Sequence, residues 1–187
     1  MIPKITTLAE YQQLASRTCP DLGVVENDLH MWSGVMTEVG ETIDMFKKNL
    51  AYKKPLDLVN VGEEIADTCW YELNNLRIKG ITINEEFVKS ELLVLIEKLE
   101  EDEVPNDEKQ RVIYTLEQYR IFNSSYDDCS VEENIAFYMF ICHIWNLDFY
   151  QLLTNNISKL MVRYPENFTN EAAINRNLDA EREQLEK

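Results

Sequence analysis

Two pairs of acidic residues lie inside otherwise apolar helical patterns, and they constrain the fold more than any other feature of this chain. The pairs are Glu38 with Glu41 and Glu64 with Asp67. Residues three apart share one face of a helix, so each pair directs two carboxylates the same way. The 22 residues of segment 42–63 are enough to finish one helix, turn and run back. We therefore predict an antiparallel helical pair on which four carboxylates converge.

Four converging carboxylates cannot all stay ionised unless a cation neutralises them. Hard oxygen ligands of this kind select Mg²⁺, Mn²⁺ or Ca²⁺. A di-iron bundle is the obvious rival, but its Glu-x-x-His motif is missing at both His30 and His143. The other alternative is that the acids form two surface strips, each paired with lysines from the set Lys47, Lys48, Lys53 and Lys54.

Composition limits the partners of the chain. With 34 acidic against 18 basic residues the net charge is −16, which disfavours binding to a nucleic-acid backbone. A phosphate-bearing partner is therefore expected to be small and accompanied by a metal ion. The four cysteines form no Cys-x-x-Cys motif, so we expect no zinc site and reduced thiols of a cytoplasmic protein. Segment 1–4 lacks a signal-peptide core, and the longest apolar stretch, 135–145, is too short to span a membrane.

The hydrophobic periodicity predicts an all-α fold, with no alternating strand pattern. Helices are expected at about 7–18, 27–50, 55–77, 82–101, 107–122, 134–147, 149–164 and 169–186. The apolar stripe of the second helix is predicted to consist of Trp32, Val35, Val39, Ile43, Phe46 and Leu50. The third helix carries a polar strip made of Asn60, Glu64, Asp67 and Tyr71.

The acid pairs also resemble a family signature. Segment 38–41 followed by segment 63–67 is similar to the ExxE…ExxD motif of the all-α nucleoside triphosphate pyrophosphohydrolases, the MazG-like superfamily. Segment 30–76 looks like the compact MazG-like proteins of phages and bacteria. A second block, Asn-Ile-Ser-Lys-Leu at 156–160 followed by Arg-Tyr-Pro at 163–165, resembles a later motif of the same family, as does the tail at 171–182.

The resemblance implies a single domain over 1–187, built on a four-helix MazG-like core. Compact members of the family pass almost directly from the third helix to the next, whereas an acidic helical insertion at about 81–129 intervenes here. Additional helices are expected from this insertion, which bears on oligomer geometry and on the shape of the base pocket. The family assembles as dimers or tetramers, so a homodimer or homotetramer is implied.

The resemblance also implies an activity: Mg²⁺-dependent hydrolysis, with Mn²⁺ as a substitute, of a nucleoside triphosphate to the monophosphate and pyrophosphate, for nucleotide-pool trimming. The implied metal ligands, which also carry the catalysis, are Glu38, Glu41, Glu64 and Asp67. Glu63 is a candidate for a supporting role beside them. The phosphate or nucleotide contacts are expected from Lys159, Arg163, Asn156 and Lys48.

Two interpretations stay open at this point. Trp32, Trp70 and Tyr71 are candidates for stacking on a base, although aromatic residues at helical spacing more often belong to a core. The alternative function is a catalytically silent helical protein that senses nucleotides or binds a partner, with the acidic insertion as its docking surface. Retention of the four carboxylates together with Lys159 and Arg163 favours catalysis.

Overall fold

The computed structural model describes residues 4–102 and 104–187, and the regular secondary structure of these residues is entirely helical. The all-α prediction is confirmed. Every helix in this part of the chain is too short or too polar to cross a membrane. The elements are α1 (Leu8–Ala15), η1 (Ser16–Thr18), α2 (Val24–Tyr52), α3 (Leu58–Ile78), α4 (Glu85–Asp102), α5 (Glu108–Ser125), η2 (Tyr126–Asp128), α6 (Val131–Ile144), α7 (Phe149–Arg163), α8 (Asn170–Ile174) and α9 (Leu178–Leu185).

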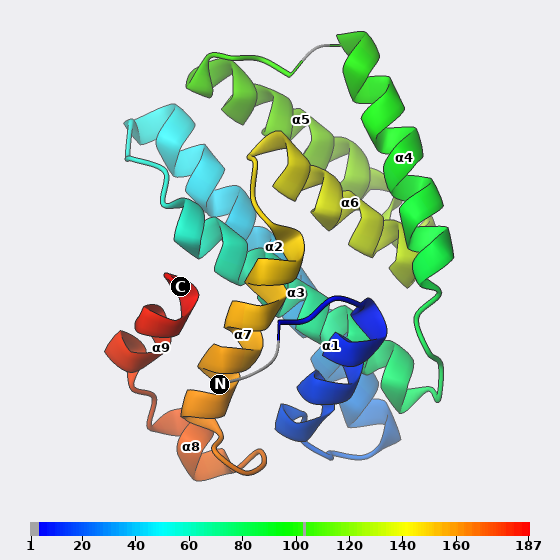
Figure 1. Ribbon diagram of the computed structural model, residues 1–187, viewed down its shortest axis with the longest axis vertical. Coiled ribbons are helices and arrows are strands. Elements are labelled where there is room, and N and C mark those ends of the chain that lie inside the picture. The colour runs from blue at the N-terminus through cyan, green and yellow to red at the C-terminus, as the bar shows by residue number, and fades with distance from the viewer. Residues whose placement is uncertain (1–3, 103) are drawn as a thin grey trace.

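The long helices α2 and α3 form an antiparallel pair that the other helices surround (Figure 1). Helices α6 and α7 pack on α3, and α1 packs on both α3 and α7. Within the expected insertion, α4 runs along α6 and α5 contacts both α2 and α6. The C-terminal helix α9 lies against α7, on the side of the molecule away from α4 (Figure 1).

The turn between α2 and α3 sets the register of the two acid pairs. Lys53 ends α2 in the left-handed conformation, with φ of 55°. Asp57 is the N-cap of α3, and its side chain accepts hydrogen bonds from the backbone N–H groups of Val59 and Asn60. The expected start of this helix at Pro55 is wrong, because the capping carboxylate lies two residues further on and Pro55 belongs to the loop.

The buried face of α2 differs from the predicted stripe. Trp32 is 53% exposed and Leu50 is 38% exposed, so these two residues do not face the core. The sequence offers apolar residues on two adjacent lines of the helix, and periodicity alone does not say which line is buried. The buried line includes Met31, Val35, Val39, Thr42 and Phe46, and its last residue, Phe46, packs on the rings of Tyr119 and Trp145.

The C-terminal segment is broken where one helix, 169–186, was predicted. Helix α8 ends at Ile174 and α9 begins at Leu178. The Asn177 side chain accepts a hydrogen bond from the backbone N–H of Ala180 and so caps α9. Because an asparagine side chain competes with helical backbone hydrogen bonds, it starts a new helix here instead of continuing the first.

A buried carboxyl outside the acid strip ties α3 to the segment after α5. Glu72 is only 1% exposed. Its Oε1 accepts hydrogen bonds from the Tyr126 hydroxyl at 3.1 Å and from the Asn134 Nδ2 at 2.8 Å. Burial raises the pKa of Glu72 to about 7, although these two hydrogen bonds lower it.

The pKa of Glu72 makes stability depend on pH. The folded chain binds the proton of the Glu72 carboxyl more tightly than the unfolded chain does. The free energy of unfolding therefore decreases as pH rises from 4.5 to about 7. We expect Glu72→Gln, which keeps the accepting oxygen, to match the wild type at pH 5. At pH 8 it should raise the free energy of unfolding by up to about 3 kcal/mol. Urea unfolding at both pH values measures this.

The matched control for that experiment is Glu117→Gln, because Glu117 is an exposed glutamate on α5. This variant should follow the wild type at both pH values. Equal destabilisation by Glu72→Gln at pH 5 and pH 8 would contradict the assignment of a strained, buried charge to Glu72.

Candidate metal site and its cleft

A cleft of about 840 Å³ opens between α2, α3, α7 and the C-terminal tail. One wall is acidic and comes from α2 and α3; it is lined by Glu38, Glu41, Glu63, Glu64 and Asp67. The facing wall comes from the end of α7 and the tail, and its charged residues are Arg163, Arg176, Asp179, Glu181 and Arg182. The predicted polar strip of α3, including Asn60 and Tyr71, therefore faces this cleft and is not paired with surface lysines.

Three of the four predicted ligands converge. Glu38, Glu41 and Glu64 each offer a carboxylate oxygen, and these atoms all lie within 4.8 Å of one another. Glu64 is buried, Glu38 is half-buried and Glu41 is exposed. Two neighbouring helices thus present a compact set of hard oxygen donors that opens to solvent on the Glu41 side, as a cation site for a small ligand requires.

The carboxylates repel one another strongly in this geometry. Burial, with the nearby charge of Asp67, raises the pKa of Glu38 to about 7. Burial also raises the pKa of Glu64 to about 9, and the hydrogen bond between Glu64 and Glu38 adds to the rise. A proton therefore relieves the repulsion between these two groups when no cation is bound. A divalent cation would do so more completely, since it also screens Glu41.

Asp67, the fourth predicted ligand, lies beside this cluster but is bound to α7. The Lys159 Nζ donates to both Asp67 oxygens, at 2.6 and 2.8 Å, and also to Glu63 at 3.1 Å. Burial alone would lower the pKa of Lys159, but the carboxylates of Asp67 and Glu63 outweigh it and raise that pKa. Lys159 is fully buried and does not line the cleft, so in this structure it neutralises two acids instead of facing a phosphate.

Asn156 completes the support of Asp67. Its Nδ2 donates to Asp67 at 2.6 Å, and its Oδ1 accepts from the Tyr11 hydroxyl at 2.8 Å. Asn156 is fully buried and is not among the cleft residues, so the structure places it behind Asp67. Spacing along α7 indicates that Asn156, Lys159 and Arg163 share a face, but it does not reveal which partner on α3 that face meets.

Of the other two basic residues predicted to contact phosphate, Lys48 lies outside the cleft and Arg163 lines it. Lys48 forms an ion pair with Asp44 on the surface of α2, as Lys47 does, and it does not line the cleft. Arg163 lies in the cleft wall and pairs with Glu181, with Nη2 to Oε2 at 2.5 Å and Nε to Oε1 at 3.0 Å. Helical spacing does not identify Glu181 as a site residue, because its partner Arg163 is 18 positions away in the sequence.

Aromatic residues also line the cleft. Trp70 and Tyr71 are there with Tyr164 and Phe168, whereas Trp32 is not. The Trp70 indole N–H donates to the Thr18 hydroxyl at 2.9 Å, which fixes the ring. His30 meets the Tyr71 ring edge-on, with centroids 5.6 Å apart. The cleft thus combines charged and aromatic lining residues, a combination that suits a phosphate attached to a planar base.

Comparisons of the chain with protein-family models, with curated protein sequences and with solved structures give no match. The resemblance to the MazG-like superfamily therefore rests on the two motif blocks alone, and the function that it implies stays a prediction.

The close approach of Tyr71 to α2 generates a test of the cleft wall. A Cβ added at Gly34 would lie 2.2 Å from the Tyr71 ring, whereas one added at Gly40 meets nothing within 4 Å. Gly34→Ala should displace Tyr71 and lower the free energy of unfolding by about 1–3 kcal/mol. Gly40→Ala, in the same helix, should raise it by about 0.5–1 kcal/mol. Urea unfolding of both variants measures the difference, and equal effects would contradict the packing of Tyr71 on Gly34.

Proposed function

We propose that this protein is a Mg²⁺-dependent nucleoside triphosphate pyrophosphohydrolase, which converts a ribo- or deoxyribonucleoside triphosphate to its monophosphate and pyrophosphate. The observation that carries the proposal is the convergence of Glu38, Glu41 and Glu64 on one wall of a cleft whose opposite wall holds arginines. The family motifs add support, since these three residues fall on the ligand positions of the MazG-like signature. The proposed role is to trim the nucleotide pool.

The donor set fits a hard divalent cation. All three converging ligands are carboxylates, and burial together with the charge of neighbouring carboxylates raises the pKa values of Glu38 and Glu64, although Lys159 lowers that of Glu38. Mg²⁺, or Mn²⁺ in its place, would supply positive charge beside the α-phosphate and lower the pKa of a water molecule bound to it. Without a cation, the acidic wall would repel a triphosphate.

The protein's own groups have distinct tasks in this proposal. Glu38, Glu41 and Glu64 hold the cation, and one of them accepts the proton of the attacking water. Lys159, which also donates to Glu63, fixes the position of Asp67, and Asp67 lies close enough to raise the pKa of Glu38 and Glu64. Asp67 adds its charge to the cation site from that fixed position. Arg163 stabilises negative charge on the leaving pyrophosphate.

The base and sugar would lie against the aromatic residues of the cleft. Trp70 and Tyr71 follow Asp67 on α3, so a nucleotide whose phosphates meet the carboxylates would extend its base toward these rings. Stacking contributes affinity with little preference among bases, because every base has an aromatic face.

The second candidate function is a nucleotide sensor or partner-binding protein without turnover. One observation favours it: Lys159 and Arg163 are both already paired with acids of this chain, Lys159 with Asp67 and Glu63 and Arg163 with Glu181. Binding of metal and nucleotide without release of pyrophosphate would identify this alternative.

An exposed apolar stripe supports assembly of the protein into a homodimer or homotetramer. Val25, Leu29 and Trp32 follow one another at helical spacing on α2 and are 66%, 58% and 53% exposed. Contiguous apolar surface of this kind marks interfaces in soluble proteins. In the proposed assembly, this stripe meets a second copy of the chain.

The proposed activity is tested by pyrophosphate release from a panel of nucleoside triphosphates, with Mg²⁺ and with EDTA. We expect release only with Mg²⁺, and Glu38→Gln and Asp67→Asn should reduce it at least about 100-fold while the helical fold persists. Glu97→Gln is the matched control, because Glu97 also belongs to a Glu-x-x-Glu sequence but is exposed on α4. Full activity of Glu38→Gln would contradict the metal-site assignment.

Assembly is tested by replacing the largest member of the stripe. Trp32→Glu places a charge in the proposed interface and should convert the oligomer to a monomer in sedimentation velocity. Leu93→Glu is the control, since Leu93 is 59% exposed on α4, away from the stripe. A wild-type protein that sediments as a monomer at all concentrations would rule out the proposed interface.

A further inference from the structure

Arg163 has a second arginine beside it, and both share one carboxylate. Glu181 accepts from Arg163 as a bidentate pair, at 3.0 and 2.5 Å. The same Glu181 Oε2 also accepts from the Arg176 Nη2 at 2.8 Å and from its Nε at 3.3 Å. All three residues line the cleft, on the wall that faces the carboxylates of α2 and α3.

Two guanidinium groups on a single acid leave this group of three residues with a net positive charge, in a protein whose overall net charge is −16. The pairing uses Nε and Nη2 of each arginine, so the Nη1 donors have no hydrogen bond within the described residues. The side chain of Glu181 is 3% exposed, that of Arg163 is 15% exposed and that of Arg176 is 39% exposed. The acid is thus buried beneath the cations, and the cations are the groups that a ligand can reach.

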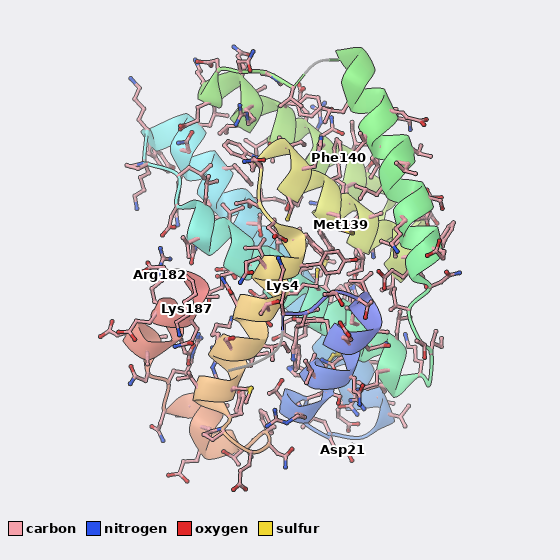
Figure 2. All side chains as sticks on the ribbon, in the orientation of Figure 1. Lys4, Asp21, Met139, Phe140, Arg182 and Lys187 are labelled. Atoms are coloured by element: carbon pink, nitrogen blue, oxygen red, sulfur yellow. The ribbon has the colours of Figure 1, made fainter. Side chains whose placement is uncertain are left out.

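The break between α8 and α9 creates this arrangement. In a continuous helix, residues five apart such as Arg176 and Glu181 would point in directions about 140° apart. Because Asn177 starts a new helix, Arg176 lies in the connecting turn and folds back onto Glu181. Arg182, labelled in Figure 2, fastens the same helix to the start of α3 through an ion pair with Asp57 at 3.1 Å. The tail is thereby fixed over the cleft at two points.

We propose that Arg176 is a second contact for the polyphosphate chain of the substrate, and that Glu181 is the positioning residue that holds Arg163 and Arg176 side by side. The inference rests on the site of the proposed function and names its ligand class more closely: a chain of at least two phosphates, accompanied by Mg²⁺. The burial of Glu181 favours a permanent support over a carboxylate that the phosphate displaces.

The chemistry of adjacent phosphates suits such a pair. The terminal two phosphates of a triphosphate carry most of its charge, and each guanidinium can donate two parallel hydrogen bonds to one of them. Two cations fixed in advance by a buried acid need little reorganisation when the ligand binds. A nucleoside monophosphate, with a single phosphate near the metal, would not reach both arginines.

The test is calorimetric titration of inorganic tripolyphosphate with Mg²⁺ into the wild type and three variants, because this probe does not depend on turnover. Arg176→Ala should weaken binding by about tenfold or more. Glu181→Gln, which keeps the shape but removes the charge that fixes both arginines, should also weaken binding. Arg120→Ala removes an exposed arginine of α5 outside the cleft and should bind as the wild type does.

Each outcome decides a separate point. Wild-type affinity in Arg176→Ala would overturn the second phosphate contact, and tighter binding by Glu181→Gln would overturn the positioning role and make Glu181 a competitor of phosphate. If Glu181→Gln fails to fold, Arg176→Lys provides the second measurement, and it should retain part of the affinity. Absence of pyrophosphate release from any nucleotide would overturn the proposed activity but leave these titrations to decide the role of Arg176.

Discussion

Mutual repulsion among the carboxylates between α2 and α3 is the constraint around which the cleft is arranged. Glu38, which is half-buried, and Glu64, which is buried, lie next to each other, and their pKa values rise to about 7 and about 9. Packing from the surrounding helices must compensate for this, since isolated carboxylates would move apart into water. Lys159 neutralises only Asp67 and Glu63, at the edge of the cluster. The centre is therefore left to a proton or a cation.

Helices α1 and α7 support the carboxylate cluster through hydrogen bonds to Asp67 and its partners. Asn156 and Lys159 of α7 and Tyr11 of α1 form a buried chain of hydrogen bonds that ends on Asp67. On the opposite wall, Glu181 ties the tail to the last residue of α7. One helix, α7, thus supports the acidic wall through its middle and the basic wall through its end, and the distance between the walls depends on it.

The sequence was sufficient to predict helices and the cleft-facing strip of α3, because both follow from periodicity within one helix. It was insufficient where a residue's partner lies on another helix. Lys159 shares a face with Arg163 along α7, yet one meets Asp67 and the other Glu181. Trp32 was expected on the buried stripe of α2 because it continues the apolar spacing of Val35 and Val39, but it is exposed and its neighbour Met31 is buried instead. The break at Asn177 depends on a local capping bond that the helical pattern conceals.

If the three converging carboxylates form a cation site, binding of the cation should release protons from them. If Glu38 and Glu64 share protons without metal, a divalent cation must displace them. Calorimetric titration of Mg²⁺ at pH 7.5, in buffers of different ionisation enthalpy, measures that displacement directly. We expect binding accompanied by proton release in the wild type, and neither in Glu64→Gln. Absence of Mg²⁺ binding to the wild type would contradict the account. So would Mg²⁺ binding that releases no protons and is equally strong in Glu64→Gln.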